Sequence, residues 1–265
     1  MTQPLVTVPL IGGLGNQMFE IATAYAYARR EGGKLLLQYI DHCGKRPVYW
    51  DSFFASFAAQ LVSGLPHLPV WREVNATTYT PLPPLTAAGL RLDGYLQSSK
   101  YFADAAEEIR ERFQAPRSLQ DAVEQKYAEL LSQRERVVVV HARRTDYLQH
   151  MEVHSPVGVE YYRESVRRVR NTVNNPLFLL VSDDPSFWRS ELPDLEGTIL
   201  DDATDVETMI LLQRFQYFVM SNSTFIWWAT WLAKPQHVWV PARWFGPKGP
   251  REWEDIYEAE WERIN

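Results

Sequence analysis

The chain carries its densest set of chemically capable side chains in one run, HARRTDY at residues 141–147. The run follows RVVVV at 136–140, a β-branched stretch typical of a parallel strand covered on both faces. Adjacent arginines there favour phosphate binding, because a guanidinium is a planar fork of donors that stays charged when partly buried. Arg143 and Arg144 would stabilise the negative charge that grows on a departing diphosphate. Asp146 would orient an arginine or accept a hydroxyl proton; a purely structural ion pair with Arg144 is the alternative.

A second group, SNST at residues 221–224, stands at the start of a predicted helix over 223–233. Side-chain oxygens in this position cap the free backbone N–H groups of a helix. The same N–H groups, together with the helix dipole, also form a binding site for phosphate. The sequence leaves both interpretations open for Asn222, Ser223 and Thr224.

A third group is the glycine turn GGLGNQ at residues 12–17, between a predicted strand at 5–11 and a predicted helix at 17–30. The turn lacks the last glycine of a dinucleotide fingerprint, which disfavours a nicotinamide or flavin cofactor. Glycines let a ligand approach the backbone, and an asparagine can bond to it through both ends of its amide. The candidate binding residues of this turn are Gly13, Gly15 and Asn16.

Two pairs of neighbouring aspartates, Asp183-Asp184 and Asp201-Asp202, follow predicted strands. A divalent metal that holds a nucleotide diphosphate would favour a spaced Asp-x-Asp, whereas adjacent side chains point apart on an extended backbone. The six histidines show no zinc spacing, so no metal ligands are predicted. A carboxylate such as Asp184 could instead accept hydrogen bonds from a purine.

The elements that must position these residues alternate regularly from residue 136 onward. Strands are predicted near 136–140, 177–181, 197–200, 218–220 and 237–240, with helices between them. This order predicts a doubly wound parallel sheet, and a second β-α-β unit opens the chain. We therefore expect an α/β fold with two facing Rossmann-like lobes, 1–132 and 133–265, and irregular structure over 41–93. Ligands bind beyond the carboxyl ends of such strands, where the candidate residues lie.

Composition narrows the functional class. The net charge is −6 with both signs interleaved, which argues against a nucleic-acid partner. No apolar run approaches the ~20 residues that span a bilayer, and no secretory leader is recognisable, so a cytoplasmic protein is expected. The single cysteine, Cys43, excludes an internal disulfide. The oligomeric state cannot be read from the sequence.

Taken together and in this order, the motifs resemble those of the bacterial α-1,2-fucosyltransferases. The resemblance spans nearly the whole chain and rests on GGLGNQMF (12–19), GYLQSSKYF (94–102), HARRTDY (141–147), VSDD (181–184) and SNSTFIWWATWL (221–232). It implies a GT-B-type fold with an acceptor-side lobe (1–132) and a GDP-fucose-binding lobe (133–265). It further implies inversion at the anomeric carbon, a glycan acceptor such as the O2 of a terminal galactose, and no cofactor or metal. Peripheral contact with the inner membrane would fit such an enzyme.

By this resemblance, Arg143 binds the diphosphate, Arg144 helps to hold GDP, and His141 supports them. Ser223 and Thr224 contact phosphate from the helix start. Asp184 is a candidate for guanine recognition. Asn16 would lie at the lobe interface, near the acceptor and the transferred sugar.

Three residues depart from the family pattern. Thr145 stands where α-1,2 members usually carry glycine, which resembles the related α-1,6 enzymes; Ile226 replaces a serine. Glu20 stands where glutamine is common and adds a carboxylate, so the catalytic base is open between Asp146, Glu20 and none. The rival interpretations are another nucleotide-sugar donor or linkage, a metal-dependent transferase, and a non-catalytic protein that binds GDP or glycan.

Overall fold

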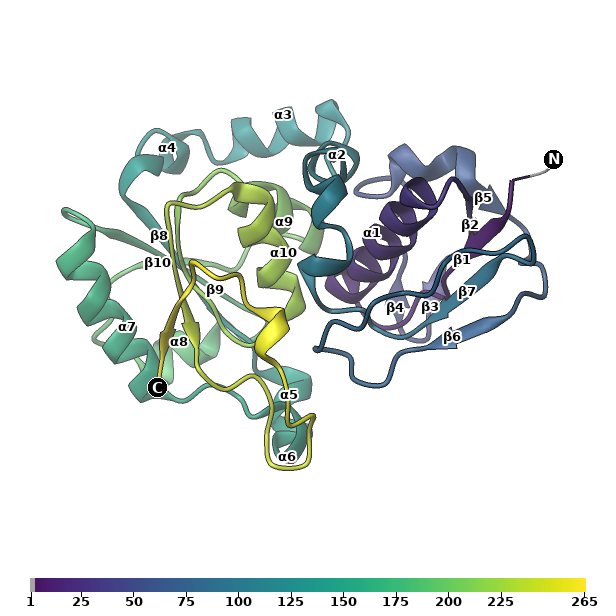
Figure 1. Cartoon of the computed structure of the whole chain (residues 1–265). Coiled ribbons are helices and arrows are strands. Elements are labelled where there is room, and N and C mark those ends of the chain that lie inside the picture. The colour runs from purple at the N-terminus through teal and green to yellow at the C-terminus, as the bar shows by residue number, and fades with distance from the viewer. Residues whose placement is uncertain (1–2) are drawn as a thin grey trace. The chain divides into compact units, whose positions relative to one another are not determined.

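The computed structural model describes residues 3–265 and divides the chain into two compact units (Figure 1). Unit 1 runs to Pro116 and includes Glu252–Glu258, while unit 2 consists of Arg117–Arg251 and Ala259–Asn265. Unit 2 therefore begins earlier than the predicted lobe boundary at 132/133. The reason is that α3 (Arg117–Lys126) packs against α9 (Asp205–Leu212), which belongs to unit 2.

Unit 2 is built on a parallel sheet of six strands in the order β10-β9-β8-β11-β12-β13. This confirms the predicted parallel α/β architecture. Every residue of β8 is buried, as expected for a run of valines covered on both faces. The strands are β8 (Val137–Ala142), β9 (Leu177–Ser182), β10 (Thr198–Leu200), β11 (Tyr217–Val219), β12 (His237–Pro241) and β13 (Glu262–Ile264).

Helices cover both faces of this sheet (Figure 1). On one face, α7 (Val159–Thr172) and α8 (Ser186–Glu191) pack on a core that includes Val138, Phe178 and Trp188. On the other lie α9 and α10 (Thr224–Ala233), which pack against each other. The remaining helices of the unit are α4 (Ala128–Leu131), η4 (Arg134–Arg136), α5 (Thr145–Gln149) and α6 (Met151–His154).

Unit 1 contains a second parallel sheet, in the order β5-β2-β1-β7-β6. The chain passes from β1 (Leu5–Thr7) through α1 (Leu14–Arg30) to β2 (Lys34–Gln38), which is the predicted β-α-β unit. The stretch 41–93, predicted as irregular, supplies the other three strands. Its further elements are β3 (His42–Cys43), β4 (Arg46–Pro47), η1 (Ala55–Gln60), β5 (Leu61–Val62), β6 (Val70–Arg72) and β7 (Leu90–Asp93). Unit 1 is completed by η2 (Ser99–Tyr101), η3 (Ala103–Ala105), α2 (Ala106–Arg112) and η5 (Glu254–Ile256).

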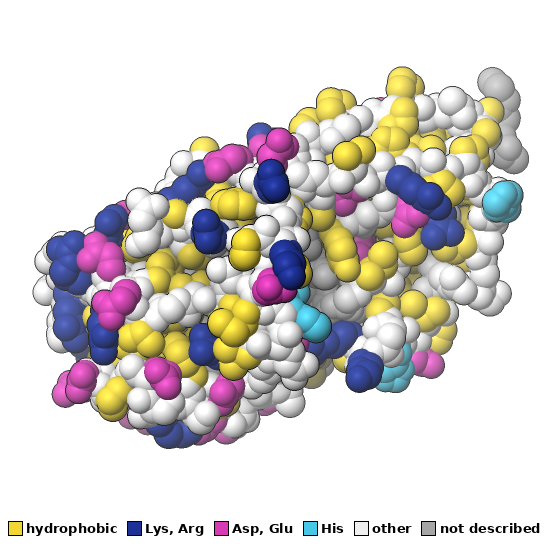
Figure 2. Space-filling model, turned by 90° about the horizontal axis from the view of Figure 1, so that it is seen from below, with side chains coloured by type: hydrophobic (Ala, Val, Ile, Leu, Met, Phe, Trp, Pro, Cys, Tyr) yellow, Lys and Arg dark blue, Asp and Glu magenta, His cyan; other side chains and the backbone are white. Residues whose placement is uncertain are grey.

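Charged residues of both signs alternate over the face of unit 2 that Figure 2 shows. The arginine-rich helix α7 follows the same rule: Arg163 pairs with Glu160, and Arg167 and Arg168 both pair with Glu164. In the described part of the chain, no helix is both long and apolar enough to cross a bilayer.

Candidate active site

The predicted residues of unit 2 meet where the strand order reverses. From β8 the chain moves outward through β9 to β10, and it then continues from β11, on the other side of β8, through β12 to β13. In open parallel sheets, ligands bind outside the carboxyl ends of the strands at this switch point. Because β8 and β11 are paired in parallel, 143–147 and 221–224 leave the sheet at the same edge.

His141 joins the ends of these two strands. Its side chain is only 5% exposed, and its Nδ1 is hydrogen-bonded to Ser221 Oγ at 2.9 Å. Its carbonyl accepts a hydrogen bond from the Tyr162 hydroxyl at 3.2 Å. Burial, assisted by the positive charge of Arg143, lowers the pKa of His141 to about 3. His141 is therefore neutral near pH 7 and suited to fixing the site rather than to carrying protons.

Arg143 is held by carboxylates. Its Nε and Nη2 donate to Oδ1 and Oδ2 of Asp146 at 2.9 and 2.8 Å, and its Nε lies 3.3 Å from Asp183 Oδ2. Burial opposes the charge of Arg143, but the bonds to Asp146 and the charge of Asp183 raise its pKa overall. The ion pair of Asp146 thus forms with Arg143, whereas the sequence alternative paired it with Arg144. Both oxygens of Asp146 accept from Arg143, which favours an orienting role.

Arg144 is differently placed. Its guanidinium carbon lies 4.3 Å from the centre of the Phe187 ring, and its Nη1 donates to the Val157 carbonyl at 3.3 Å. Within residues 3–265, no carboxylate forms an ion pair with it. A partly buried guanidinium with no counter-ion beside the strand ends is well suited to bind an anion.

Asp183, which was noted from the sequence as following a strand but was given no role, organises this region. It follows β9 directly, and its carboxylate accepts from the backbone N–H groups of Arg144 and Thr145 at 2.8 and 3.2 Å. It also accepts from the hydroxyl of Thr145, a bond that glycine could not form. Its position just after a strand was the available signal.

The neighbouring aspartate, Asp184, was the predicted guanine-binding residue. Its Oδ1 accepts from the backbone N–H and the hydroxyl of Ser186, at the start of α8. In this structure its side chain therefore stabilises a helix terminus. Recognition of guanine by Asp184 remains a prediction.

The start of α10 presents the second predicted group. Ser223 is the N-cap residue, but its side chain forms no capping hydrogen bond. The side-chain amide of Asn222 donates to the backbone carbonyls of His154, Ser155 and Trp244. The backbone carbonyl of Asn222 accepts from the Tyr147 hydroxyl at 2.8 Å. Asn222 thus ties the surrounding loops to the helix start. Thr224 opens the ten-residue helix, whose N-terminal N–H groups face the same edge as Arg143.

The remaining predicted residues form a group in unit 1. Gly13 is the N-cap of α1, Gly15 is buried in its first turn, and Asn16 Oδ1 accepts from Gln97 Nε2 at 3.1 Å. Glu20 is fully buried, and its Oε2 accepts from the Ile11 N–H at 2.9 Å. Burial raises the pKa of Glu20 well above 4.5, so its carboxyl favours the protonated form.

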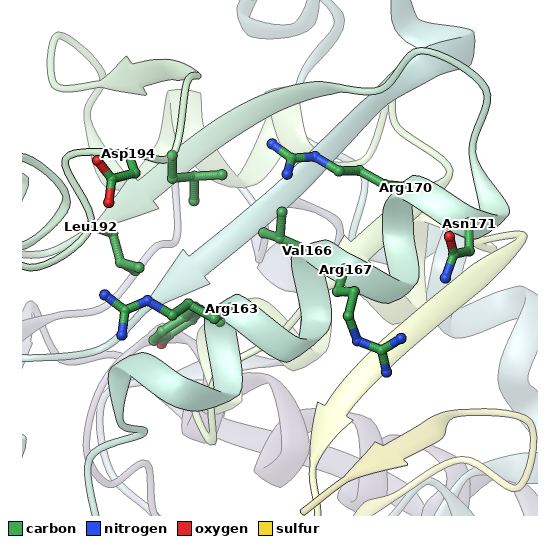
Figure 3. A pocket seen from close by; sticks show the side chains of 9 residues that line it. Arg163, Val166, Arg167, Arg170, Asn171, Leu192 and Asp194 are labelled. Atoms are coloured by element: carbon green, nitrogen blue, oxygen red, sulfur yellow. The ribbon is translucent and has the colours of Figure 1, made fainter.

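A cavity of about 350 Å³ lies elsewhere in unit 2, beside α7 (Figure 3). Arg163, Val166 and Arg170 of α7 line one side, and Leu192 and Asp194 line the opposite side. None of the predicted site residues borders it. In the described part of the chain, no cluster of three or more histidine, cysteine or acidic residues is arranged to hold a metal ion.

Comparison with known proteins identifies the family of the chain. Residues 85–265 match the family model described as glycosyl transferase family 11. The chain belongs to glycosyl transferase family 11. The matched range contains the motifs at 94–102, 141–147 and 221–232. The predicted enzyme class, a glycosyltransferase, is confirmed.

Curated relatives of this family 11 glycosyltransferase agree with the predicted resemblance. An α-1,2-colitosyltransferase of Escherichia coli is 27% identical over 259 residues, covering 86% of this chain and 87% of the relative. The mouse galactoside α-(1,2)-fucosyltransferase 2 is 26% identical over 256 residues, covering 90% of this chain and 71% of the relative. The resemblance to α-1,2-fucosyltransferases is thereby confirmed.

Solved structures show the same fold. The α-1,6-fucosyltransferase NodZ, soaked with GDP-fucose, aligns with a TM-score of 0.59 at 13% identity, covering 90% of this chain and 94% of that one. POFUT1 in complex with GDP aligns with a TM-score of 0.57 at 12% identity, covering 91% and 99%. These likenesses confirm the predicted GT-B-type α/β class.

Proposed function

We propose that this family 11 glycosyltransferase transfers L-fucose from GDP-fucose to a glycan hydroxyl, the O2 of a terminal galactose. Its α-1,2-fucosyltransferase relatives support the reaction type, and the structural likenesses support the fold. The observation that carries the proposal is the pair Arg143 and Arg144 at the switch point of unit 2. One guanidinium is oriented by two carboxylates, and the other has no carboxylate partner among the described residues.

The reaction we propose is a single inverting displacement. The acceptor oxygen forms a bond to the anomeric carbon of fucose from the face opposite GDP. The bond from that carbon to the β-phosphate oxygen breaks, its electron pair stays on GDP, and the proton of the acceptor hydroxyl passes to solvent water. Arg143 and Arg144 stabilise the charge that develops on the diphosphate. Most of the acceleration comes from this stabilisation and from positioning the two sugars.

Neither carboxyl proposed as the base is well suited to that role. Both carboxylate oxygens of Asp146 accept hydrogen bonds from Arg143, and the raised pKa of Glu20 disfavours its ionised form. A loose, cation-like transition state needs little help from a base. We therefore propose that Asp146 acts by orienting Arg143.

The other predicted residues receive supporting roles. We propose that Ser223 and Thr224 contact phosphate at the start of α10, where Ser223 forms no cap bond of its own. Asn222 and His141 hold this phosphate site in shape, and Asp184 contacts guanine. In unit 1, the glycine turn and Asn16 contact the sugars.

We also propose that the reaction requires no divalent metal, and that the protein acts in the cytoplasm on glycan intermediates at the inner membrane. Arginine charge would take the place of a metal ion at the diphosphate. Transfer that persists in EDTA supports the first statement, and transfer abolished by EDTA and restored by Mg²⁺ or Mn²⁺ contradicts it. Fractionation of the producing cells tests the second.

The decisive experiment is transfer from GDP-fucose by Arg143→Ala and Arg144→Ala. Each variant should lose at least about 100-fold in kcat/KM, the scale of removing one donor from a developing anion. Arg163→Ala is the matched control, because its guanidinium lies on α7 and pairs with Glu160. Activity of Arg143→Ala within a few fold of wild type would overturn the assignment.

A second donor is favoured by one observation, the α-1,2-colitosyltransferase relative, which matches over most of both chains. Colitose differs from L-fucose by the absence of the 3-hydroxyl group. Competition between GDP-fucose and GDP-colitose for one acceptor identifies the donor by the ratio of the two kcat/KM values. Linkage analysis of the product separates α-1,2 from α-1,6 transfer.

A further inference from the structure

The motif at 94–102 contains an unusual turn in unit 1. After β7 ends at Asp93, the chain turns through Gly94–Gln97, and Leu96 has a φ of +55° although it is not glycine. Leu96 is also fully buried. Large side chains seldom adopt this left-handed conformation, which persists only where the surroundings enforce it and which is often found at binding sites.

Glu73 enforces this conformation. Its Oε2 accepts from the backbone N–H of Leu96 at 2.9 Å. The carboxylate presses so closely on Gly94 that a Cβ there would lie 2.5 Å from Oε2. Its other oxygen, Oε1, is buried and has no hydrogen-bond partner within residues 3–265. Burying a carboxyl oxygen without a hydrogen-bond partner lowers the stability of the fold. The presence of Glu73 at this position therefore favours a functional role for its side chain.

The turn presents Gln97 to α1. Gln97 is 7% exposed, its backbone N–H donates to the Ala76 carbonyl at 2.8 Å, and its side-chain Nε2 donates to Asn16 Oδ1 at 3.1 Å. Among the described residues, no hydrogen bond is formed by the remaining amide oxygen of Gln97. Two linked amides offer both donors and acceptors in a fixed arrangement, which suits the neighbouring hydroxyl groups of a sugar ring.

We propose that Gln97 and Asn16 form a hydroxyl-binding subsite for the acceptor sugar, and that Glu73 is the positioning residue that holds this subsite through Leu96. The proposal rests on the proposed glycosyl transfer and identifies where unit 1 recognises the acceptor. Burial raises the pKa of Glu73 to about 7. Because Oε2 accepts from Leu96 whether or not the carboxyl is charged, glutamine can take over the positioning task.

Gln97→Leu tests the subsite. The acceptor KM should rise at least tenfold, while the Kd for GDP stays within twofold of wild type. Acceptors that each lack one hydroxyl group identify the group that Gln97 binds. Removing that hydroxyl should raise the acceptor KM of wild type but not that of Gln97→Leu. An unchanged acceptor KM, or an equal effect on donor and acceptor, overturns the subsite.

Glu73→Ala and Glu73→Gln test the positioning role. Glu73→Ala should reproduce the rise in acceptor KM, and Glu73→Gln should restore it to within threefold of wild type. Glu31→Ala is the matched control, because Glu31 also accepts a backbone N–H in unit 1, that of Leu85, outside the motif. If Glu73→Gln loses kcat as severely as Glu73→Ala, a proton-transfer role replaces the positioning role.

Two outcomes separate this proposal from the proposed function. If wild type transfers fucose but Gln97→Leu has an unaltered acceptor KM, only the subsite fails. If wild type transfers no sugar from any donor, the proposed function fails, and saturation-transfer NMR with a galactoside then tests the subsite by binding alone. A galactoside signal in wild type that Gln97→Leu abolishes supports the subsite, and a signal retained in the variant overturns it.

Discussion

At the scale of single residues, the site of unit 2 depends on a histidine that stays neutral. His141 bridges the ends of β8 and β11 through Ser221, and its side chain is almost entirely buried. Protonation would place a charge in this enclosed position close to the Arg143 guanidinium. The neutral form of His141 therefore contributes to the stability of the folded chain, and this contribution declines as the pH is lowered.

The lowered pKa of His141 makes the stability of the fold depend on pH. The folded pKa of His141, about 3, lies below its ordinary 6.5, so between these values the unfolded chain binds more protons than the native one. Stability from this residue is complete above pH 6.5 and is lost as the pH falls toward 3, by up to about 1.4 kcal/mol per unit. His141→Asn should flatten the decline in urea-unfolding free energy between pH 6.5 and 4.

The exposed histidine His42 supplies the control. His42→Asn should keep the wild-type dependence of unfolding free energy on pH. If His141→Asn shows the same slope as wild type over this interval, the neutral bridge is not the acid-sensitive element of unit 2.

The sequence predicted where the residues of the site lie, but it did not predict which side chains pair with one another. The parallel sheet places every strand's carboxyl end at one edge, so 141–147 and 221–224 could be expected there from their sequence context alone. Which carboxylate meets which arginine depends on side-chain packing that no local pattern encodes. Asp146 therefore pairs with Arg143, and Asp183 rather than Asp184 holds the backbone of Thr145.

At the scale of elements, a helix or strand was predicted correctly where its own residues show the pattern typical of that element. The β-branched run of β8 and the helical periodicity of α7 and α1 are of this kind. The strands β5 to β7 have two to four residues among prolines and loops, and they become strands only by pairing with distant segments. The three-residue edge strand β13 escaped prediction for the same reason.

The start of α9 gives a prediction at this scale. Thr204 and Glu207 form a capping box, with the Thr204 hydroxyl accepting from the Glu207 N–H at 3.2 Å and the Glu207 carboxylate accepting from the Thr204 N–H at 2.8 Å. Thr204→Ala should destabilise unit 2 by about 1 kcal/mol, which lowers its melting temperature by about 2–4 °C. Transferase activity at 25 °C should stay within twofold of wild type.

Thr172→Ala is the matched control for this substitution. Its hydroxyl donates to a carbonyl at the other end of a helix, α7, so no initiating N–H group loses its partner. Calorimetry should show little change for Thr172→Ala. Equal melting temperatures for the two variants would contradict the stabilising role of the capping box.

At the scale of the whole molecule, the end of the chain contributes to both units. Glu252–Glu258 belongs to unit 1, where the Thr77 hydroxyl donates to the Glu252 carbonyl at 2.8 Å and Lys100 pairs with Asp255 at 2.5 Å. Ala259–Asn265 belongs to unit 2 and supplies β13 and Trp261. The sequence predicted two consecutive lobes. In the structure, the chain returns from unit 2 to unit 1 at Glu252–Glu258 and then ends in unit 2.

Two nested deletions should separate these contributions. Removing 259–265 takes away β13 and the Trp261 ring, whose centre lies 5.8 Å from that of Trp227, and should destabilise unit 2 by at least about 3 kcal/mol. Amide hydrogen exchange should then quicken in β8 and β11 while β1 and β7 keep their protection. Removing 252–265 should also quicken exchange in η2, which packs on η5. If the shorter deletion weakened protection equally in both sheets, the two units would be stabilised as one cooperative body, and the assignment of 259–265 to unit 2 alone would be wrong.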